Sequence, residues 1–261
     1  QEGLGGELEL LVSGSAALQS RLTKVFCAAN IPVMEGYGLT ETSPVISVND
    51  MRNGGFRVGT VGKVLDGVEV KIAEDGEILC KGPNVMMGYY KDETQTADVL
   101  KDGYFHSGDI GEIDSDGFLK ITDRKKEMFK TSGGKYVAPQ ILENAFKQSR
   151  FIDQIMVIGD GEKMPAAFIQ PNFEFVREWA TRHNLNFNTN EELCANKMVI
   201  DRIQEEINHS NEKFGNWEKV KRFELTPDVW SIVDGHLTPT MKLKRKIIKE
   251  KYNDLYQKIY G

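Results

Sequence analysis

Three short polar segments carry side chains suited to holding different parts of an adenine nucleotide. They are Gly36-Tyr37-Gly38-Leu39-Thr40-Glu41, Ser107-Gly108-Asp109 and Asp123-Arg124-Lys125-Lys126-Glu127. A lysine, Lys242, follows far downstream in Thr238-Pro239-Thr240-Met241-Lys242. Each segment alone is an ordinary loop sequence, so only their occurrence together and in this order predicts a nucleotide site.

The segment 36–41 combines backbone freedom with three useful side chains. Its two glycines let the backbone approach a ligand closely, and Tyr37 offers a flat ring on which a purine could stack. Thr40 supplies a hydroxyl for a phosphate oxygen, and Glu41 supplies a carboxylate of the kind that magnesium prefers. The same residues also suit a tight turn with a buried tyrosine, so this segment alone leaves both interpretations open.

The other two segments add a carboxylate and a permanent positive charge. Asp109 could accept hydrogen bonds from both hydroxyls of a ribose, although a Gly-Asp turn between strands is the simpler interpretation of this segment alone. Arg124 is a forked donor for ribose or α-phosphate oxygens, whereas the charges at 125–127 also fit a solvated run. His106 lacks a neighbouring nucleophile, so we expect a turn or partly buried histidine rather than a general base.

Composition excludes several other classes of protein. Of the 261 residues 40% are hydrophobic, which suffices for packed cores, and the formal net charge of −6 argues against a nucleic-acid partner. The three cysteines form no close pair, so neither a disulfide framework nor a zinc site is indicated. No apolar run could span a bilayer, and residues 1–6 do not resemble a signal peptide. A cytoplasmic location is therefore expected.

The pattern of expected helices, strands and turns changes twice along the chain. An apolar strand at 8–12, a helix ending near Ala29 and a strand at 31–34 that leads into the 36–41 loop suit an open α/β sheet. Between 58 and 121, short strands and four Asp-Gly pairs, at 66–67, 75–76, 102–103 and 116–117, predict a small antiparallel β subdomain.

The charged segment 123–127 is the best domain boundary, because a compact α+β pattern follows it. Pro139 opens a helix, and strands are expected at 154–158, 166–170 and 220–225. Helices are expected near 173–183 and 191–213, and the last helix places Ile248, Tyr252, Leu255 and Ile259 on one stripe.

Together these segments resemble the adenylate-forming superfamily of acyl-CoA synthetases, luciferases and peptide-synthetase adenylation domains. The resemblance runs through the whole chain, and the matching segments fall in the family's order, which makes it specific. They are Gly14-Ser15-Ala16, 36–41, Gly76-Glu77-Ile78 with Gly82, Gly88-Tyr89, 107–109, 123–126 and the Lys242 segment. The segments 132–139 and 237–245 look most like the long-chain fatty acid branch.

This resemblance implies a fold class of α/β and α+β: the C-terminal part of a large α/β domain with a small antiparallel β subdomain, followed by a small mobile α+β domain. The implied bounds are 1–57 for the end of the α/β sheet, 58–124 for the β subdomain, 125–127 for a hinge and 128–261 for the mobile domain. The abrupt start and the lack of the family's phosphate-binding loop imply a fragment that is inactive alone.

The resemblance also implies a role for each candidate residue. Gly14, Ser15 and Ala16 would frame the adenine together with Tyr37 and Gly38; Thr40 would touch the α-phosphate and Glu41 would hold magnesium. Asp109 and Arg124 would bind the ribose, Lys126 would be the hinge, and Gly133-Gly134 would line the entry of coenzyme A. Lys242 would reach the carboxylate and the α-phosphate. Most of the superfamily has glycine immediately before this lysine, whereas Met241 stands here, so Lys244 is the alternative.

The implied reaction joins a long-chain fatty acid to coenzyme A through an acyl-AMP intermediate, with ATP consumed and pyrophosphate and AMP released. Two alternatives remain: an acyl-AMP ligase that hands its acyl group to a carrier protein, and a non-catalytic interaction module. The basic stretch 242–251 could contact the inner face of a membrane, but its narrow apolar stripe is explained equally well by packing within its own domain. The oligomeric state is not predicted.

Overall fold

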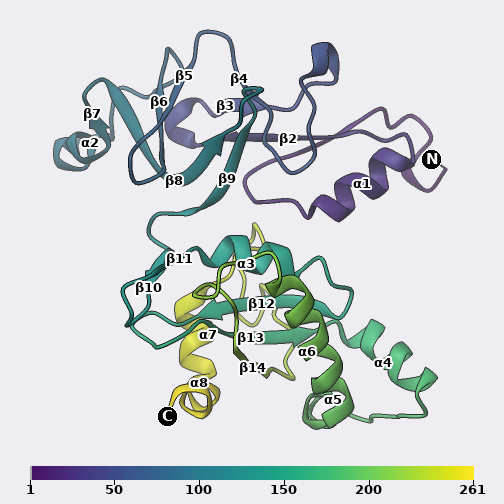
Figure 1. Cartoon of the computed structure of the whole chain (residues 1–261). Helices are drawn as coiled ribbons and strands as arrows, with labels where there is room; N and C mark the ends of the chain where they lie inside the picture. Colours follow the sequence, from purple (N-terminus) through teal and green to yellow (C-terminus); the bar gives the residue numbers. More distant parts are fainter. Residues whose placement is uncertain (1) are drawn as a thin grey trace. The chain divides into compact units, whose positions relative to one another are not determined.

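The computed structural model describes residues 2–261, apart from the side chains of Glu2 and Asn53, and divides the chain into two compact units (Figure 1). The first unit is Gln1–Lys126 and the second is Glu127–Gly261. No helix within the described residues is long and apolar enough to cross a membrane.

The first unit opens with a four-stranded sheet in the order β1-β2-β3-β4. Strands β1 and β2 are parallel, and the other two pairs are antiparallel. The elements are a 3₁₀ turn at Glu2–Leu4, β1 (Leu11–Ser13), α1 (Ser20–Ala28), β2 (Val33–Gly38), 3₁₀ turns at Thr40–Thr42 and Arg52–Gly54, β3 (Val45–Val48) and β4 (Lys63–Val64). Because β1 and β2 run in the same direction, their carboxyl ends meet at one edge of the sheet.

A second, fully antiparallel sheet completes this unit, in the order β5-β6-β8-β7 with β9 beside β8. Its elements are β5 (Glu69–Ile72), β6 (Glu77–Lys81), α2 (Glu93–Val99), β7 (Leu100–Lys101), β8 (Tyr104–Ile113) and β9 (Leu119–Arg124). Three of the four predicted Asp-Gly hairpins are present, at 75–76, 102–103 and 116–117. The pair 66–67 instead forms a turn that leads from β4 in the first sheet to β5 in the second.

Side chains from both sheets share one apolar cluster. Ile46 on β3, Cys80 on β6 and Phe105 on β8 are fully or almost fully buried against one another. Tyr37 and Leu39 pack on this cluster, so the segment 36–41 rests on a fixed apolar support.

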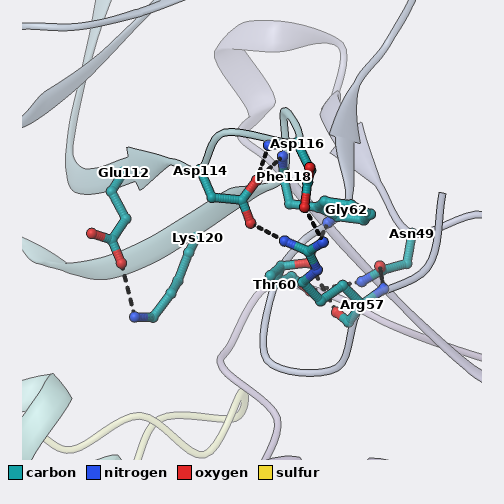
Figure 2. Close-up of polar contacts among 9 residues, drawn as sticks. All are labelled: Asn49, Arg57, Thr60, Gly62, Glu112, Asp114, Asp116, Phe118 and Lys120. Carbon is teal, nitrogen blue, oxygen red and sulfur yellow. Dashed lines mark hydrogen bonds and ion pairs between the residues drawn. The ribbon is translucent and has the colours of Figure 1, made fainter. Parts of the chain in front are cut away.

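Arg57 fastens the loop before β4 to the hairpin between β8 and β9 (Figure 2). Its guanidinium forms ion pairs with Asp114 and Asp116 and lies 4.2 Å above the ring of Phe118. The backbone of the loop is tied to Arg57 as well, because the Thr60 hydroxyl donates to the Arg57 carbonyl at 2.9 Å. This clamp joins the two sheets at a second place, away from the apolar cluster.

The second unit has a three-stranded sheet in the order β12-β13-β14, in which β12 and β13 are antiparallel and β13 and β14 are parallel. A short hairpin precedes it. The elements are β10 (Phe129–Lys130), β11 (Tyr136–Val137), α3 (Pro139–Phe146), β12 (Ile152–Ile158), β13 (Ala166–Pro171), α4 (Phe173–Arg182), α5 (Asn190–Ala195), α6 (Lys197–Asn211), β14 (Arg222–Leu225), α7 (Arg245–Lys251) and α8 (Asn253–Tyr260).

Helices cover both faces of this sheet. Successive residues of a strand point to opposite faces, and Ile155 and Val157 of β12 belong to one apolar cluster whereas Met156 and Ile158 belong to another. The first cluster includes side chains of α3, α5 and α6, and the second includes Ile248 of α7 and Ile259 of α8. The predicted stripe of the last helix therefore packs on its own unit.

Several of the sequence-based elements differ from the structure. Strand β1 covers only the end of the predicted strand 8–12, and β2 continues through the predicted loop as far as Gly38 because it pairs with β3. The predicted helix 191–213 is broken, since the Asn196 side chain accepts hydrogen bonds from two amides and caps α6. The last helix breaks at Tyr252, whose hydroxyl donates to Asp228 at 2.8 Å. Other predicted helices and strands also differ from the structure in their bounds.

Candidate functional site

Three candidate residues from distant parts of the first unit meet at one carboxylate. The hydroxyl of Tyr37 donates to Asp109 Oδ2 at 2.8 Å, and Arg124 Nε lies 3.1 Å from Asp109 Oδ1. Tyr37 comes from β2 in the first sheet, whereas Asp109 and Arg124 are direct neighbours on β8 and β9. Each oxygen of the carboxylate thus contacts a donor group, which restricts its orientation.

The protonation state of Tyr37 follows from its burial beside Asp109. The side chain of Asp109 is only 7% exposed, and that of Arg124 is 46% exposed. Burial, together with the negative charge of Asp109, raises the pKa of Tyr37 far above its ordinary value of 10. Tyr37 therefore keeps its proton and remains a hydrogen-bond donor to Asp109 throughout the physiological range.

Gly14, Ser15 and Ala16 follow the end of β1, beside the start of the segment 36–41. Ser13 pairs with Glu35 in the parallel register, and a Cβ added to Gly14 would lie 3.6 Å from the Gly36 carbonyl oxygen. The three residues are exposed. They form an open rim at the carboxyl end of the strands, which is the edge where ligands bind in open α/β sheets.

Gly38 is required by a close approach of two backbone segments. A Cβ at this position would lie 1.6 Å from the Pro44 carbonyl oxygen, so any other residue would push β2 and β3 apart. The turn that follows exposes Thr40 and leaves Glu41 half-buried, with Glu41 Oε1 accepting a hydrogen bond from the Tyr89 hydroxyl at 2.9 Å. The carboxylate is thus steadied at the surface by a residue 48 positions away.

Glu41 is suited to binding a magnesium ion whose other ligands are water and nucleotide phosphates. Among the described residues no group of three or more His, Cys, Asp or Glu side chains could hold a metal ion. Magnesium commonly binds through one or two carboxylates, several waters and substrate phosphates. A single steadied carboxylate beside the exposed Thr40 hydroxyl agrees with that type of site, and it does not suit a metal held by protein alone.

Glu77 holds the second segment in place, and sequence reasoning assigned it no role. Its Oε1 accepts from the Gly108 amide at 2.9 Å, and its Oε2 accepts from Lys125 Nζ at 2.8 Å and lies 3.2 Å from His106 Nδ1. Burial raises the pKa of Glu77, but these three contacts outweigh burial and hold the pKa below its ordinary value of 4.5. His106 is therefore a partner of Glu77, consistent with the expected partly buried histidine.

The junction of the two units is anchored on both sides of Lys126. The Lys125 amide donates to the Gly108 carbonyl at 2.8 Å, and its ammonium also pairs with Asp75 at 2.6 Å, all within the first unit. Glu127 forms an ion pair with Arg245 inside the second unit. Lys126 is exposed and makes no side-chain hydrogen bond or ion pair within the described part of the chain.

Gly133 and Gly134 form the exposed tip of the β10–β11 hairpin. Gly134 has a φ of 78°, in the left-handed region that glycine adopts without steric cost, and its amide donates to the Thr131 carbonyl at 2.8 Å. The hairpin is also fixed from its side, because the Ser132 amide donates to the Glu162 carbonyl at 2.8 Å.

Lys242 follows the tip of a tight hairpin in the second unit. Leu237 and Leu243 pair as an antiparallel bridge, and the Thr238 amide donates to the Lys242 carbonyl at 2.8 Å. Met241, at the position where glycine was expected, adopts a φ of 61° in the left-handed region. Lys244 lies outside the tip, and its amide donates to the His236 carbonyl at 2.8 Å. Lys242 thus lies directly after the turn and Lys244 is the N-cap of α7, and both residues are half-buried.

Comparison with known proteins identifies the family. A model of the AMP-binding enzyme family matches residues 1–90, and the AMP-binding enzyme C-terminal domain matches residues 127–261. The chain belongs to the AMP-binding enzyme family. The predicted family resemblance is thereby confirmed.

Curated relatives and solved structures extend over nearly the whole chain. It is 36% identical over 259 residues to the long-chain-fatty-acid–CoA ligase FadD15 of Mycobacterium bovis, and this match covers 99% of the chain and 43% of the relative. It is 36% identical over 277 residues to the long-chain-fatty-acid–CoA ligase 1 of Homo sapiens, covering 100% of the chain and 39% of the relative. The chain thus spans less than half the length of these relatives.

Solved structures of the same fold confirm the predicted fold class. The A-PCP didomain of a carboxylic acid reductase from Segniliparus rugosus, in complex with AMP, superposes with a TM-score of 0.75 at 22% identity, covering 99% of this chain and 35% of that one. The anthranilate CoA ligase AuaEII in complex with anthranoyl-AMP superposes with a TM-score of 0.71 at 22% identity, covering 93% of this chain and 44% of that one.

Proposed function

We propose that this chain is part of an enzyme that activates a long-chain fatty acid with ATP and transfers the acyl group to coenzyme A. The observation that carries the proposal is the Asp109 carboxylate held between Tyr37 and Arg124, 2.8 and 3.1 Å away. The fatty acid and coenzyme A come from the curated relatives, which are named long-chain-fatty-acid–CoA ligases.

In this proposal the rim of the first unit binds the adenosine part of the nucleotide. The ribose hydroxyls donate to the nearly buried carboxyl group of Asp109, and Arg124 contributes the positive charge beside it. The exposed strand ends at Gly14, Ser15 and Ala16 receive the adenine together with Gly38 and the ring of Tyr37. Because these groups are already in place, binding requires little reorganisation of the protein.

The first half-reaction forms acyl-AMP. A carboxylate oxygen of the fatty acid attacks the α-phosphorus of ATP, and the bond from that phosphorus to pyrophosphate breaks. Thr40 donates its hydroxyl to an α-phosphate oxygen, and Lys242 brings positive charge to the reacting oxygens. Magnesium, held by Glu41 and phosphate oxygens, would supply further charge neutralisation. In the second half-reaction the thiol of coenzyme A attacks the acyl carbon, and AMP leaves.

Two half-reactions at one nucleotide need a conformational step, and we assign its hinge to Lys126. The support is local: Lys125 is bound within the first unit and Glu127 is bound within the second, whereas Lys126 between them forms no side-chain hydrogen bond or ion pair with any described residue. The glycines at 133 and 134, on the exposed hairpin of the second unit, are proposed to line the path of coenzyme A.

The role of Lys242 is tested in the longer enzyme that contains this chain by measuring the two half-reactions separately. Lys242→Ala should lower fatty-acid-dependent pyrophosphate exchange by about 100-fold or more, the usual order for loss of one charge-stabilising group, and should spare thioester formation from supplied acyl-AMP. Lys244→Ala and Lys246→Ala are the controls. Equal loss of both half-reactions in Lys242→Ala, or loss of exchange only in Lys244→Ala, would refute the assignment.

The acyl acceptor is tested separately. Purified enzyme with acyl-AMP should form a thioester with free coenzyme A and should leave a carrier protein's phosphopantetheine unmodified. Transfer to the carrier alone would replace the proposed acceptor by a carrier protein. Absence of any AMP or acyl-AMP binding would instead indicate a non-catalytic module.

A further inference from the structure

The guanidinium of Arg245 sits in a cage of acceptors inside the second unit. Its Nε lies 3.2 Å from Glu127 Oε2, its Nη2 lies 2.7 Å from Glu143 Oε2, and its Nη1 donates to the Val157 carbonyl at 3.3 Å. Every nitrogen of the guanidinium thus has a partner. Glu143 is closed on its other side as well, because its Oε1 accepts from the Val157 amide at 2.7 Å.

The cage joins segments that are far apart in the chain. Glu127 is the first residue of the second unit, Glu143 lies on α3 and Val157 lies on β12. Arg245 is the first residue of α7 and comes three positions after Lys242. A planar, permanently charged fork can satisfy several acceptors at fixed angles, which the single ammonium of a lysine could not do.

The hairpin of residues 237–243, called the lysine hairpin because it carries Lys242, is joined to Arg245 by two backbone contacts. The bridge between Leu237 and Leu243 closes the hairpin, and the Lys244 amide donates to the buried His236 immediately before Arg245 begins the helix. A displacement of Arg245 would therefore move both ends of the turn that precedes Lys242. Glu127 Oε2 also accepts from Gln140 Nε2 of α3 at 3.1 Å, and Arg245 connects Glu127 to the part of the chain that carries Lys242.

This cage is not explained by stability alone, because burying charged groups has a desolvation penalty that can offset their mutual attraction. The Glu143 side chain is 6% exposed and that of Arg245 is 24% exposed, so both charges lose most of their hydration. Buried ion pairs often contribute no more than apolar residues of the same size, while they fix relative geometry. The fixed geometry here relates Glu127, which follows Lys126, to the end of the lysine hairpin, where α7 begins.

We propose that Arg245 is a positioning residue, which holds the Lys242 hairpin in a set orientation relative to the segment that follows the hinge at Lys126. The inference deepens the proposed function and rests on it. Arg245 touches neither nucleotide nor acyl group in this role; it acts on Lys242 through the backbone of residues 243–245.

The first test uses the 261-residue chain and does not depend on activity. Glu127→Gln keeps the shape of the side chain and removes the charge that pairs with Arg245 Nε. The amides of Met241, Lys242 and Lys244, all hydrogen-bonded in the hairpin, should exchange with deuterium about tenfold faster, the order expected for losing one charge-assisted hydrogen bond. Amides of β12 and β13 should keep their rates.

A matched control is available on α6 of the same unit. Glu206 forms an ion pair with Arg202, and both side chains are partly buried, at 20% and 28% exposure. Glu206→Gln makes the same chemical change and should leave exchange in the hairpin unaltered. Unchanged hairpin exchange in Glu127→Gln, or an equal increase in Glu206→Gln, would overturn the positioning role.

The second test is a double-mutant cycle in the longer enzyme. Glu127→Gln should lower the kcat of pyrophosphate exchange by about tenfold, should leave the KM for ATP unaltered, and should have no further effect once Lys242 is replaced by alanine. An equal loss with and without Lys242 would show a general effect on the fold and would overturn the inference. If Lys242→Ala itself has no effect, the proposed function fails, while the exchange experiment still decides whether Arg245 orders the hairpin.

Discussion

Met241→Gly tests whether the lysine hairpin carries backbone strain. Met241 has a φ of 61° and directly precedes Lys242, and its amide donates to the Thr238 carbonyl at 2.8 Å. The turn has the form of a three-residue hairpin loop whose last position is left-handed, a position that favours glycine. Methionine there has a Cβ that crowds the following carbonyl oxygen.

Two opposing effects set the size of the change. The left-handed conformation costs a non-glycine residue roughly 1–2 kcal/mol, which the glycine variant recovers. Glycine loses more conformational entropy on folding, by roughly 0.5–1 kcal/mol. The Met241 side chain is 58% exposed, so little apolar burial is lost. We therefore expect Met241→Gly to raise the free energy of unfolding of the second unit by about 0.5 kcal/mol.

Urea unfolding followed by tryptophan fluorescence measures this unit selectively. All three tryptophans, Trp179, Trp217 and Trp230, lie after residue 126, and Trp230 is buried beside His236, next to the hairpin. Thr240→Gly is the control, because Thr240 is exposed and outside the left-handed region. This substitution adds backbone entropy and removes the exposed hydroxyl contact with Thr238 at 3.1 Å, so it should lower stability by about 1 kcal/mol. If both variants lose stability equally, the strain argument is wrong.

Two further predictions concern the first unit. Tyr37→Phe removes the hydroxyl that donates to Asp109 and keeps the ring, so titration calorimetry on the longer enzyme should show AMP affinity falling by about tenfold. Tyr90→Phe, at an exposed ring, is the control and should not change the affinity. Unaltered affinity in Tyr37→Phe would contradict the nucleotide role. Because the pKa of Glu77 is lower when folded, its stabilising contribution is present above pH 4.5 and is lost as pH falls through the folded-state pKa. Glu77→Gln should therefore flatten the acid side of the stability curve measured by circular dichroism, and equally steep curves would exclude this role.

Short sequence motifs correctly predicted the turns and helix starts that depend only on neighbouring residues. Asp-Gly pairs predicted three hairpins because the turn residues themselves require a left-handed backbone, and Pro139 predicted the start of α3. The pair at 66–67 has the same turn chemistry, yet β4 pairs with β3, a choice made by residues elsewhere. The breaks before α6 and at Tyr252 depend on side-chain hydrogen bonds that helix periodicity does not reveal.

In the candidate site, too, the sequence predicted some residues and missed others. Residue types and their order predicted Tyr37, Asp109 and Arg124, and the structure brings these three side chains together. Neither spacing nor composition predicted Glu77 or Arg245 as supports, since the partners of Glu77 lie up to 48 residues away and Arg245 lies 102 residues from Glu143. A support is defined by its partners, and these are known only after the chain has folded.

The residues that support the candidate site groups in the first unit all do so by hydrogen bonds from distant parts of the sequence. The carboxylate of Asp109 is held by Tyr37, that of Glu41 by Tyr89, and the Gly108 amide by Glu77, each through a long-range hydrogen bond of 2.8–2.9 Å. In the second unit the Lys242 hairpin is tied to Arg245 by backbone alone. Each unit therefore fixes its own groups before any ligand arrives, and fixed dipoles and charges stabilise a transition state without reorganisation at the moment of reaction. If the proposed function holds and both units are rigid, we expect the freedom that two half-reactions require to lie at the junction between the units, where Lys126 makes no side-chain hydrogen bond or ion pair with the described residues.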